Sequence, residues 1–564
     1  MVFFFFITSF ASSVASPDAE ILLSFKGSLQ NPIFLSSWND SVPHCTWVGV
    51  SCQLGRVTSL ALASTSLRGH IPASVFSLST LVFLDLSSNA LVGEIPPQIG
   101  QLKRLRQLSL SQNQLSGEIP GEIGGLTHLR SLKLGLNSLT GEIPAGIGRL
   151  TRLDTLDLSG NGLSGALPPE IGALSRLENF IAPSCSIAGP LPDEIAGMSS
   201  LSKLDLSYNP LGCRIPNSIG QLKNLTMMNL VYAELNGSIP AELGSCRNLK
   251  MLTLSFNSLS GSLPEELSGL PLLTFSAEKN EFTGPLPPWF GKWTQMESLL
   301  LSGNKFEGRI PTEIGNCSSL QHRLVLNNNQ LRGTIPKEIG NLTALSVLNL
   351  NSNFLEGSIP FELGNCGSLT TLDLGNNRLN GSIPDQLADL GQLQCLVLSH
   401  NNLSGEIPGS LAELTNLTTL DLSGNRLAGS IPSEFGQCSK LQGLYIGNNL
   451  LSGTIPASLG GLGSLVKLNL TGNQLHGSVP TSFSNLKELS HMDLSFNDLD
   501  GQLPSTLPEM LNLVGLFVQH NRISGCLDQF LSNSVSWRIE TLNLSHNMIN
   551  GELPASIGNL SVNT

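Results

Sequence analysis

Three large aromatic side chains recur at a constant spacing in the first half of this chain. Tyr208, Tyr232 and Phe256 follow one another at intervals of 24 residues. Rings of this size have little acid–base chemistry at neutral pH, but each one buries roughly 150–250 Å² when a partner covers it. The residues near them in the pattern add the mixed polar and apolar surface on which protein ligands are anchored: Lys203, Asp205, Met227, Asn229, Lys250 and Met251. These nine residues are the predicted ligand-binding site. The sequence leaves one alternative open, in which the rings only fill a variable position of a repeat, as Phe496 does in isolation.

The sequence predicts no catalytic residues, no cofactor and no metal site. The nine histidines are dispersed, and His400, His520 and His546 belong to separate repeats. The chain has neither a GxxxxGK[ST] phosphate loop nor the HRD and DFG motifs of a kinase. The acid pair Glu265 and Glu266 has no facing partner for general acid–base catalysis, and no histidine or cysteine cluster has metal-ligand spacing. We therefore expect a binding protein and not an enzyme.

A repeat that covers most of the chain positions the three rings. The pattern LxxLxLxxNxLxGxIPxxIGxL recurs about every 24 residues, about twenty-one times, from Val57 onward. A period in this range with leucine at these offsets is the leucine-rich repeat, in which each unit gives one short strand and one return segment. The predicted fold is an α/β leucine-rich-repeat solenoid, a right-handed curved superhelix over residues 57–562.

Each position of the repeat has a predicted role. Positions 1–6 are expected to form a strand, with leucine at positions 1, 4 and 6 pointing inward and the rings at position 8 on the concave face. Position 9 is usually asparagine, as at Asn113 and Asn425, and is expected to bond backbone groups of neighbouring turns as a ladder. Cys185 and Ala233 replace that asparagine in two repeats.

The beginning of the chain has the features of a secreted protein. Residues 1–15, an apolar stretch that ends in small residues, resemble a signal peptide. Residues 16–56 are expected to cap the first repeat, with a helix that starts at Ser16 as the N-cap residue and Pro17 in its first turn. Cys45 and Cys52 are predicted to form a disulfide in this cap.

The other cysteines and the glycosylation sequons follow from the repeat. Cys185 and Cys213 lie at turn positions of adjacent coils and are predicted to form a second disulfide. The cysteines that replace the leucine of the IGxL segment are expected to be buried: Cys246, Cys317, Cys366 and Cys438. The predicted N-glycosylation sites are Asn39, Asn224, Asn236, Asn341, Asn380, Asn402, Asn416, Asn469 and Asn543. The repeat itself generates Asn-Leu-Thr and Asn-Gly-Ser, so a sequon alone does not establish a glycan.

Charge and hydropathy exclude two classes of partner. The net charge is −12, and the clustered cations that nucleic-acid binding requires are not evident, so we expect no nucleic-acid partner. After the apolar N-terminus no run reaches the roughly 18 apolar residues of a transmembrane segment. The chain stops inside a repeat, and we expect the solenoid to lack a C-terminal cap.

The Gly-x-Ile-Pro return segments together with the cap sequence CTWVGVSC resemble the extracellular domains of plant leucine-rich-repeat receptor-like kinases, over residues 17–562. The resemblance implies the extracellular ligand-binding region of a cell-surface receptor, located in the secretory pathway and on the extracellular face of the plasma membrane. It implies a small secreted peptide or Cys-rich protein as the ligand on the concave face, and a co-receptor kinase of the somatic-embryogenesis class as the partner.

Two alternatives to a signalling receptor stay open. Members of that family carry a membrane helix and a kinase domain that this sequence does not contain, which leaves a kinase-less decoy receptor. The other alternative is a secreted leucine-rich-repeat inhibitor of a pathogen cell-wall-degrading enzyme, although such inhibitors typically have far fewer repeats and their own C-terminal cap.

Overall fold

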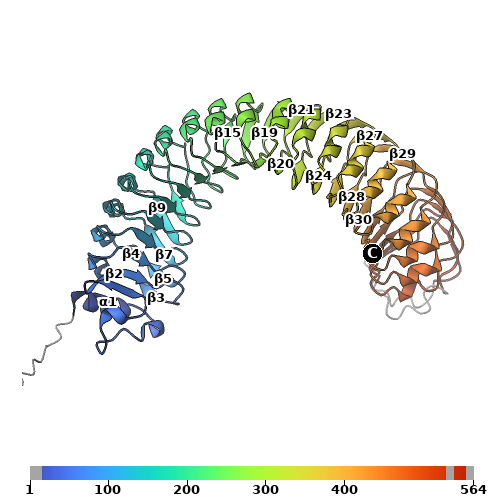
Figure 1. Ribbon diagram of the computed structural model, residues 1–564. Helices are drawn as coiled ribbons and strands as arrows, with labels where there is room; N and C mark the ends of the chain where they lie inside the picture. Colours follow the sequence, from blue (N-terminus) through green and yellow to red (C-terminus); the bar gives the residue numbers. More distant parts are fainter. Residues whose placement is uncertain (1–15, 529–538, 554–564) are drawn as a thin grey trace, which may run out of the picture. The chain divides into compact units, whose positions relative to one another are not determined.

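The computed structural model describes residues 16–528 and 539–553, and the predicted signal peptide lies outside them. The chain divides into two compact units, residues 1–259 and 260–564. Each unit is a stack of repeats, with strands on its concave side and short 3-10 turns on its convex side (Figure 1). The predicted leucine-rich-repeat fold is confirmed.

Parallel strands, one from each repeat, line the concave side of each unit. In the first unit they are β2 (Arg56–Ala61), β4 (Phe83–Asp85), β6 (Gln107–Ser109), β8 (Ser131–Lys133), β10 (Thr155–Asp157), β12 (Asn179–Ile181), β13 (Lys203–Asp205), β14 (Met227–Asn229) and β16 (Met251–Thr253). In the second unit they are β18 (Thr274–Ser276), β20 (Ser298–Leu300), β22 (Arg323–Val325), β24 (Val347–Asn349), β26 (Thr371–Asp373), β28 (Cys395–Val397), β30 (Thr419–Asp421), β32 (Gly443–Tyr445), β34 (Lys467–Asn469), β36 (His491–Asp493), β38 (Gly515–Phe517) and β40 (Thr541–Asn543). Equivalent residues pair in register, for example Leu108 with Leu132.

These strands are shorter than the six positions predicted. From β4 onward each has three residues, positions 3–5 of the repeat, because the chain turns away after position 5. The inward leucines are nevertheless buried as predicted, with Leu105, Leu108 and Leu110 at most 1% exposed. The core of each unit is therefore a column of leucine layers, and each repeat depends on its neighbours for burial.

The return segments carry a second set of strands and the convex turns. Lateral strands of the first unit include β5 (Ala90–Gly93), β7 (Gln114–Glu118) and β9 (Ser138–Glu142), and those of the second include β23 (Gln330–Gly333), β25 (Phe354–Gly357) and β27 (Arg378–Gly381). A proline precedes most of the 3-10 turns, among them η4 (Pro97–Gln101), η5 (Gly121–Gly125) and η6 (Ala145–Arg149). The fixed φ of proline suits the entry to such a turn.

The asparagine ladder predicted at position 9 is confirmed. Asn401 is buried, and its Nδ2 donates to the carbonyl oxygens of Leu374 and Leu398 at 3.0 and 3.1 Å. Its Oδ1 accepts a hydrogen bond from the N–H of Leu379 at 3.0 Å. One side chain thus satisfies buried backbone groups of two neighbouring repeats, which would be costly to leave unpaired.

The N-terminal cap closes the apolar end of the first repeat. Helix α1 (Pro17–Gly27) begins at the predicted residue with Ser16 as its N-cap residue, although Ser16 makes no side-chain capping hydrogen bond. Leu22 and Phe25 on the helix are fully buried, and the ring of Trp38 stacks on that of Trp47 at 5.6 Å. The cap therefore has an aromatic core of its own.

One of the two predicted disulfides forms, and the other does not. Cys45 and Cys52 form the predicted disulfide, with their Cα atoms 5.5 Å apart. Cys185 and Cys213 are free thiols, so the predicted second disulfide is wrong. The reason is that Cys185 takes over the role of the ladder asparagine. Its thiol lies in the buried turn and donates to the carbonyl oxygen of Leu158 at 3.4 Å, and burial raises the pKa of both thiols.

The cysteines of the IGxL segments are buried as predicted. The thiol of Cys246 donates to the carbonyl oxygen of Ile219 at 3.3 Å, and that of Cys317 to Phe290 at 3.3 Å. Burial raises the pKa of Cys246, Cys317 and Cys366 to about 11. These thiols are therefore protonated and unreactive at neutral pH.

Reduction of the protein is expected to loosen the cap and leave the repeats intact. The Cys45–Cys52 bond closes a loop with a sequence separation of 7, and a loop of this length contributes about 2 kcal/mol by restricting the unfolded segment. Hydrogen exchange of residues 17–60 should rise in Cys52→Ser protein while that of β20–β30 stays unchanged. Peptide mapping without reduction should find Cys45 linked to Cys52, and Cys185 and Cys213 alkylated as free thiols. A Cys185–Cys213 cross-link, or no change in exchange, would contradict the structure.

Candidate ligand-binding surface

The three predicted rings occupy a backbone position that disfavours them. Tyr208, Tyr232 and Phe256 have φ angles of 56°, 52° and 59°. This left-handed conformation costs roughly 1–2 kcal/mol for residues with a Cβ atom, and glycine and asparagine are the usual occupants. Position 8 is glycine at Gly160 and Gly303, asparagine at Asn328 and Asn376, and a larger residue such as Leu136 in a minority of repeats. Three consecutive aromatic residues are therefore not what the backbone alone would select.

The rings form one continuous stack across β13, β14 and β16. The ring centroids of Tyr208 and Tyr232 are 5.1 Å apart with an interplanar angle of 22°, and those of Tyr232 and Phe256 are 4.3 Å apart with an angle of 10°. The side chains remain exposed by 55%, 44% and 40% respectively. Stacking orders the rings before any ligand arrives, which lowers the entropic cost of binding.

A set of polar side chains that hydrogen-bond to one another lies beside the rings. Asp205 Oδ1 accepts hydrogen bonds from the backbone N–H and the hydroxyl of Ser207 at 3.0 and 2.7 Å. Asn229 Nδ2 donates to Asp205 Oδ2 at 3.1 Å, and Asn229 Oδ1 accepts from the hydroxyl of Thr253 at 2.9 Å. Asp205 and Asn229 therefore use much of their hydrogen-bonding capacity inside the protein. We expect them to position the surface and not to be its main contacts.

The remaining predicted residues supply apolar area and positive charge. Met251 is 41% exposed, Met227 is half-buried, and Lys203 and Lys250 are exposed on the same strands. The structure thus brings all nine predicted residues onto neighbouring repeats of the first unit. Three ordered rings, two flexible apolar side chains and two lysines can bind an extended polypeptide with an acidic group beside an apolar one.

The left-handed backbone at position 8 was missed at the sequence level. The signal was present, because glycine, asparagine and serine alternate at that position in most other repeats. A comparison of position 8 across the repeats would also have shown that aromatic residues are energetically unfavourable there, because small or polar residues usually occupy it.

Phe496 is not isolated, contrary to the prediction. Its ring stacks on the imidazole of His520 at 4.4 Å, which in turn stacks on His546 at 4.1 Å. The prediction placed these histidines far apart, but they lie on neighbouring repeats of the second unit. Rings at position 8 can therefore stack wherever consecutive repeats carry them, so stacking alone does not identify a binding site.

The predicted glycosylation sites fall into two groups according to how exposed their asparagine side chains are. Asn39, Asn224, Asn236, Asn341, Asn380 and Asn402 are exposed, whereas Asn416, Asn469 and Asn543 are half-buried. Asn469 and Asn543 belong to the concave strands β34 and β40, and their Oδ1 atoms accept backbone hydrogen bonds from Thr471 and Ser545 at 3.0 and 3.2 Å. The six exposed asparagines are therefore the better acceptors.

Among the residues that the structure describes, one cluster of metal-ligand types exists that sequence spacing did not predict. His44, Cys45 and Cys52 place their potential ligand atoms within 4.8 Å of one another. Both sulfur atoms belong to the disulfide, so they are not thiolate ligands in this structure. No helix within residues 16–528 or 539–553 is long and apolar enough to cross a membrane.

Comparison with known families and proteins places the chain among receptors. Residues 113–239 match the family described as leucine-rich repeat region, and residues 15–53 match the leucine-rich repeat N-terminal domain.

The receptor protein kinase EMS1 of Arabidopsis thaliana is 53% identical over 85 residues, which are 14% of this chain and 7% of that protein. A probable receptor-like serine/threonine-protein kinase of the same plant, At3g47570, is 44% identical over 72 residues, 12% of this chain and 7% of its own length. The matched segments thus span a small part of these relatives.

Solved structures extend the similarity over nearly the whole chain. The Arabidopsis receptor kinase HAESA, solved with the peptide hormone IDA and the co-receptor SERK1, is 33% identical with a TM-score of 0.82, over 96% of this chain and 95% of that one. The plant peptide hormone receptor RGFR1, solved with RGF2, is 34% identical with a TM-score of 0.79, over 88% and 85% of the two chains. The resemblance inferred from the return segments and the cap is confirmed, and the chain belongs to the family of plant leucine-rich-repeat receptor ectodomains.

Proposed function

We propose that this chain is the extracellular ligand-binding region of a plant cell-surface receptor, and that its ligand is a small secreted peptide or Cys-rich protein. The observation that carries the proposal is the stack of Tyr208, Tyr232 and Phe256, three exposed rings at consecutive left-handed positions. Burying the stack against a ligand would offset the backbone cost of placing rings there.

The two lysines give the proposed ligand an orientation. Lys203 and Lys250 are exposed at either end of the three strands that carry the site, β13, β14 and β16. An acidic group of the ligand would lie near one of these lysines, with apolar side chains against the rings and methionines.

A co-receptor kinase of the somatic-embryogenesis class is the proposed second partner. HAESA was solved as a complex that contains both a peptide hormone and SERK1, and its fold extends over nearly all of this chain. The proposed site of action is the extracellular face of the plasma membrane, reached through the secretory pathway, with glycans on the exposed sequons such as Asn236 and Asn380.

The test is ligand-dependent recruitment of the co-receptor. The purified chain is immobilised and exposed to a panel of synthetic secreted peptides and small Cys-rich proteins, which includes IDA and RGF2, and binding of the SERK1 ectodomain is then measured. We expect one member of the panel to bind and to increase SERK1 binding. Binding of a pathogen cell-wall-degrading enzyme with loss of its activity, and no peptide binding, would support the inhibitor alternative. Ligand binding without recruitment would support a decoy.

A further inference from the structure

A column of basic side chains runs along one edge of the first unit. Arg104, His128, Arg152 and Arg176 occupy the same position in four consecutive repeats. Each lies three residues before a strand residue that pairs in register with the next, from Gln107 in β6 to Asn179 in β12. Because adjacent parallel strands are about 4.8 Å apart, the column presents one basic side chain at each repeat at regular spacing, and the three arginines among them always carry a positive charge.

All four side chains are exposed, and none of them has an ion pair within the part of the chain that the structure describes. Glu94, Glu118 and Glu142 of the same repeats lie apart from the column, in the Gly-Glu-Ile-Pro segments on the return side, whereas Asp154 and Glu178 lie two residues after Arg152 and Arg176. Asp154 forms an ion pair with Arg130 at 3.5 Å. Because Arg106 and Arg130 occupy the position of these two acids in the preceding repeats, the strip has more cations than anions and can attract an anion.

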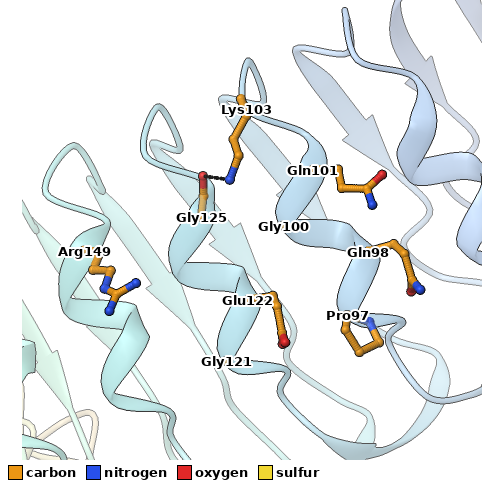
Figure 2. Close-up of a pocket in the computed structure, with 9 residues that line it drawn as sticks. All are labelled: Pro97, Gln98, Gly100, Gln101, Lys103, Gly121, Glu122, Gly125 and Arg149. Atoms are coloured by element: carbon orange, nitrogen blue, oxygen red, sulfur yellow. Dashed lines mark hydrogen bonds between the residues drawn. The ribbon is translucent and has the colours of Figure 1, made fainter.

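A hollow that is lined partly by glycine residues lies beside the column on the convex side. It has a volume of about 470 Å³ and extends across η4, η5 and η6. Figure 2 shows Arg149 at one side of it, Gln98 and Gln101 at the other, and Lys103, Glu122 and Gly125 between them. Lys103 Nζ donates to the carbonyl oxygen of Gly125 at 3.2 Å, and a Cβ atom at Gly125 would lie 2.7 Å from that Nζ.

A side chain at Gly121 would project into open space. A Cβ atom there would meet nothing within 4 Å. Equivalent positions in other repeats carry alanine, asparagine or lysine, for example Ala145, Asn217 and Lys337, and a comparable hollow of about 530 Å³ lies beside Asn217. Lys103 and Arg149 line the hollow together with the acidic Glu122. The strip and the hollow together form a surface with room for a chain of small rings or sugars.

We propose that this surface, formed by the basic column and the adjoining hollow, binds a linear acidic polysaccharide. Each sugar of a polyuronate carries one carboxylate, so its charge recurs along the chain as the cations recur along the repeats. A protein ligand would require apolar anchors, and within residues 81–180 the exposed large apolar side chains are Val92 and Leu136. Leu136 lies at position 8 and Val92 on β5, both away from the column. This site is separate from the aromatic stack and does not depend on the proposed receptor function.

The experiment measures binding of polygalacturonate oligomers to the full chain, in parallel with fully methyl-esterified oligomers of the same length. We expect the acidic form to bind, the uncharged form not to bind, and the affinity to fall when salt is raised from about 0.05 to about 0.5 M, because exposed charges are screened. Binding of both forms alike, or of neither, would overturn the proposal. Poly-L-glutamate that binds more tightly than polygalacturonate would also overturn it, in favour of an acidic polypeptide.

Three variants distinguish binding at the proposed surface from an effect of the net charge of the protein. The double variant Arg152→Glu and Arg176→Glu should weaken polygalacturonate binding at least about tenfold, since each exposed charge contact contributes a few-fold and reversal adds repulsion. Gly121→Gln should also weaken it, because the side chain fills the hollow. The control Arg426→Glu reverses an exposed arginine of the second unit and should bind as the unaltered protein does. All three variants should keep the melting temperature, since every altered residue is exposed. Equal weakening by the control would show that net charge alone controls binding and would overturn the site.

Discussion

Alanine in place of Tyr232 should weaken ligand binding at least about thirtyfold. Tyr232 is the central ring of the stack, with Tyr208 on one face and Phe256 on the other. Truncating a buried aromatic anchor typically costs 2 kcal/mol or more, which corresponds to about thirtyfold in Kd. The measurement is the affinity of Tyr232→Ala protein for the peptide or Cys-rich protein that the recruitment screen identifies, by calorimetry or biosensor.

Phe496 provides a matched control for that experiment. Its ring is 52% exposed, lies at the same left-handed position with φ 53°, and is also stacked on a neighbouring ring. Phe496→Ala should therefore lower stability by the loss of one ring contact, where Tyr232→Ala loses two, but leave the ligand affinity unchanged. If both variants bind equally well, the aromatic stack is not the ligand site.

A substitution that suits the backbone separates binding from folding. Tyr208→Asn places a residue that tolerates the left-handed conformation at φ 56°. The relief of backbone strain and the loss of one ring contact are each about 1 kcal/mol, so the melting temperature should change little. The ligand affinity should still fall. A large loss of stability would show that the ring contributes mainly to folding.

The fold could be predicted from the sequence because each repeat contacts mainly its neighbours. Leucines at fixed offsets, such as Leu105 and Leu108, determine the buried layer, and the ladder asparagines satisfy the same backbone groups in each turn. The Cys45–Cys52 bond was predictable because it is short-range and belongs to a cap. These features all follow from a pattern with a period of one repeat.

The errors arose where a residue departs from its repeat. Cys185 takes over the hydrogen bond of the asparagine that it replaces, and the sequence alone did not show that its thiol points into the turn. Asp205 and Asn229 stay predicted contacts, and the sequence did not show that hydrogen bonds with Ser207 and with each other already engage them. The stack of His520 and His546 went unrecognised because the two histidines were treated as separate surface residues, although their repeats are neighbours. Each error concerns the direction of one side chain, which the repeat pattern does not specify.

Loss of the carboxylate of Asp18 should destabilise the N-terminal cap by about 2–3 kcal/mol. The sequence places Asp18 in the first turn of α1, where an acid favours the helix dipole. The structure gives it a larger role, since it is 1% exposed and accepts hydrogen bonds from Arg56 Nε and Nη2, both at 3.0 Å, and from the N–H of Val57 at 2.9 Å. Asp18→Ala leaves the buried N–H of Val57 without its partner and breaks a charge-assisted pair.

Hydrogen exchange localises that effect. Because repeats are coupled mainly to their neighbours, exchange should accelerate in α1 and β2 and remain unchanged in the repeats from β20 onward. Glu20→Gln is the matched control, since Glu20 is an exposed acid on the same helix and should exchange as the unaltered protein does. Equal exchange in Asp18→Ala and Glu20→Gln proteins would mean that the Arg56 pair does not stabilise the cap.

Acid should reproduce the effect of the substitution without a change in sequence. Burial raises the pKa of Asp18, but the hydrogen bonds from Arg56 and Val57 outweigh it and hold the pKa below its ordinary value. A carboxylate with a lowered pKa in the folded state contributes its full stabilisation above about pH 4, the ordinary pKa of aspartate, and loses it as the pH falls through the lowered value. Exchange in α1 should therefore increase between about pH 4 and pH 2 in the unaltered protein, after correction for the intrinsic pH dependence of exchange. Asp18→Ala protein should lack this increase. If both proteins respond to acid in the same way, another carboxylate controls the stability of the cap.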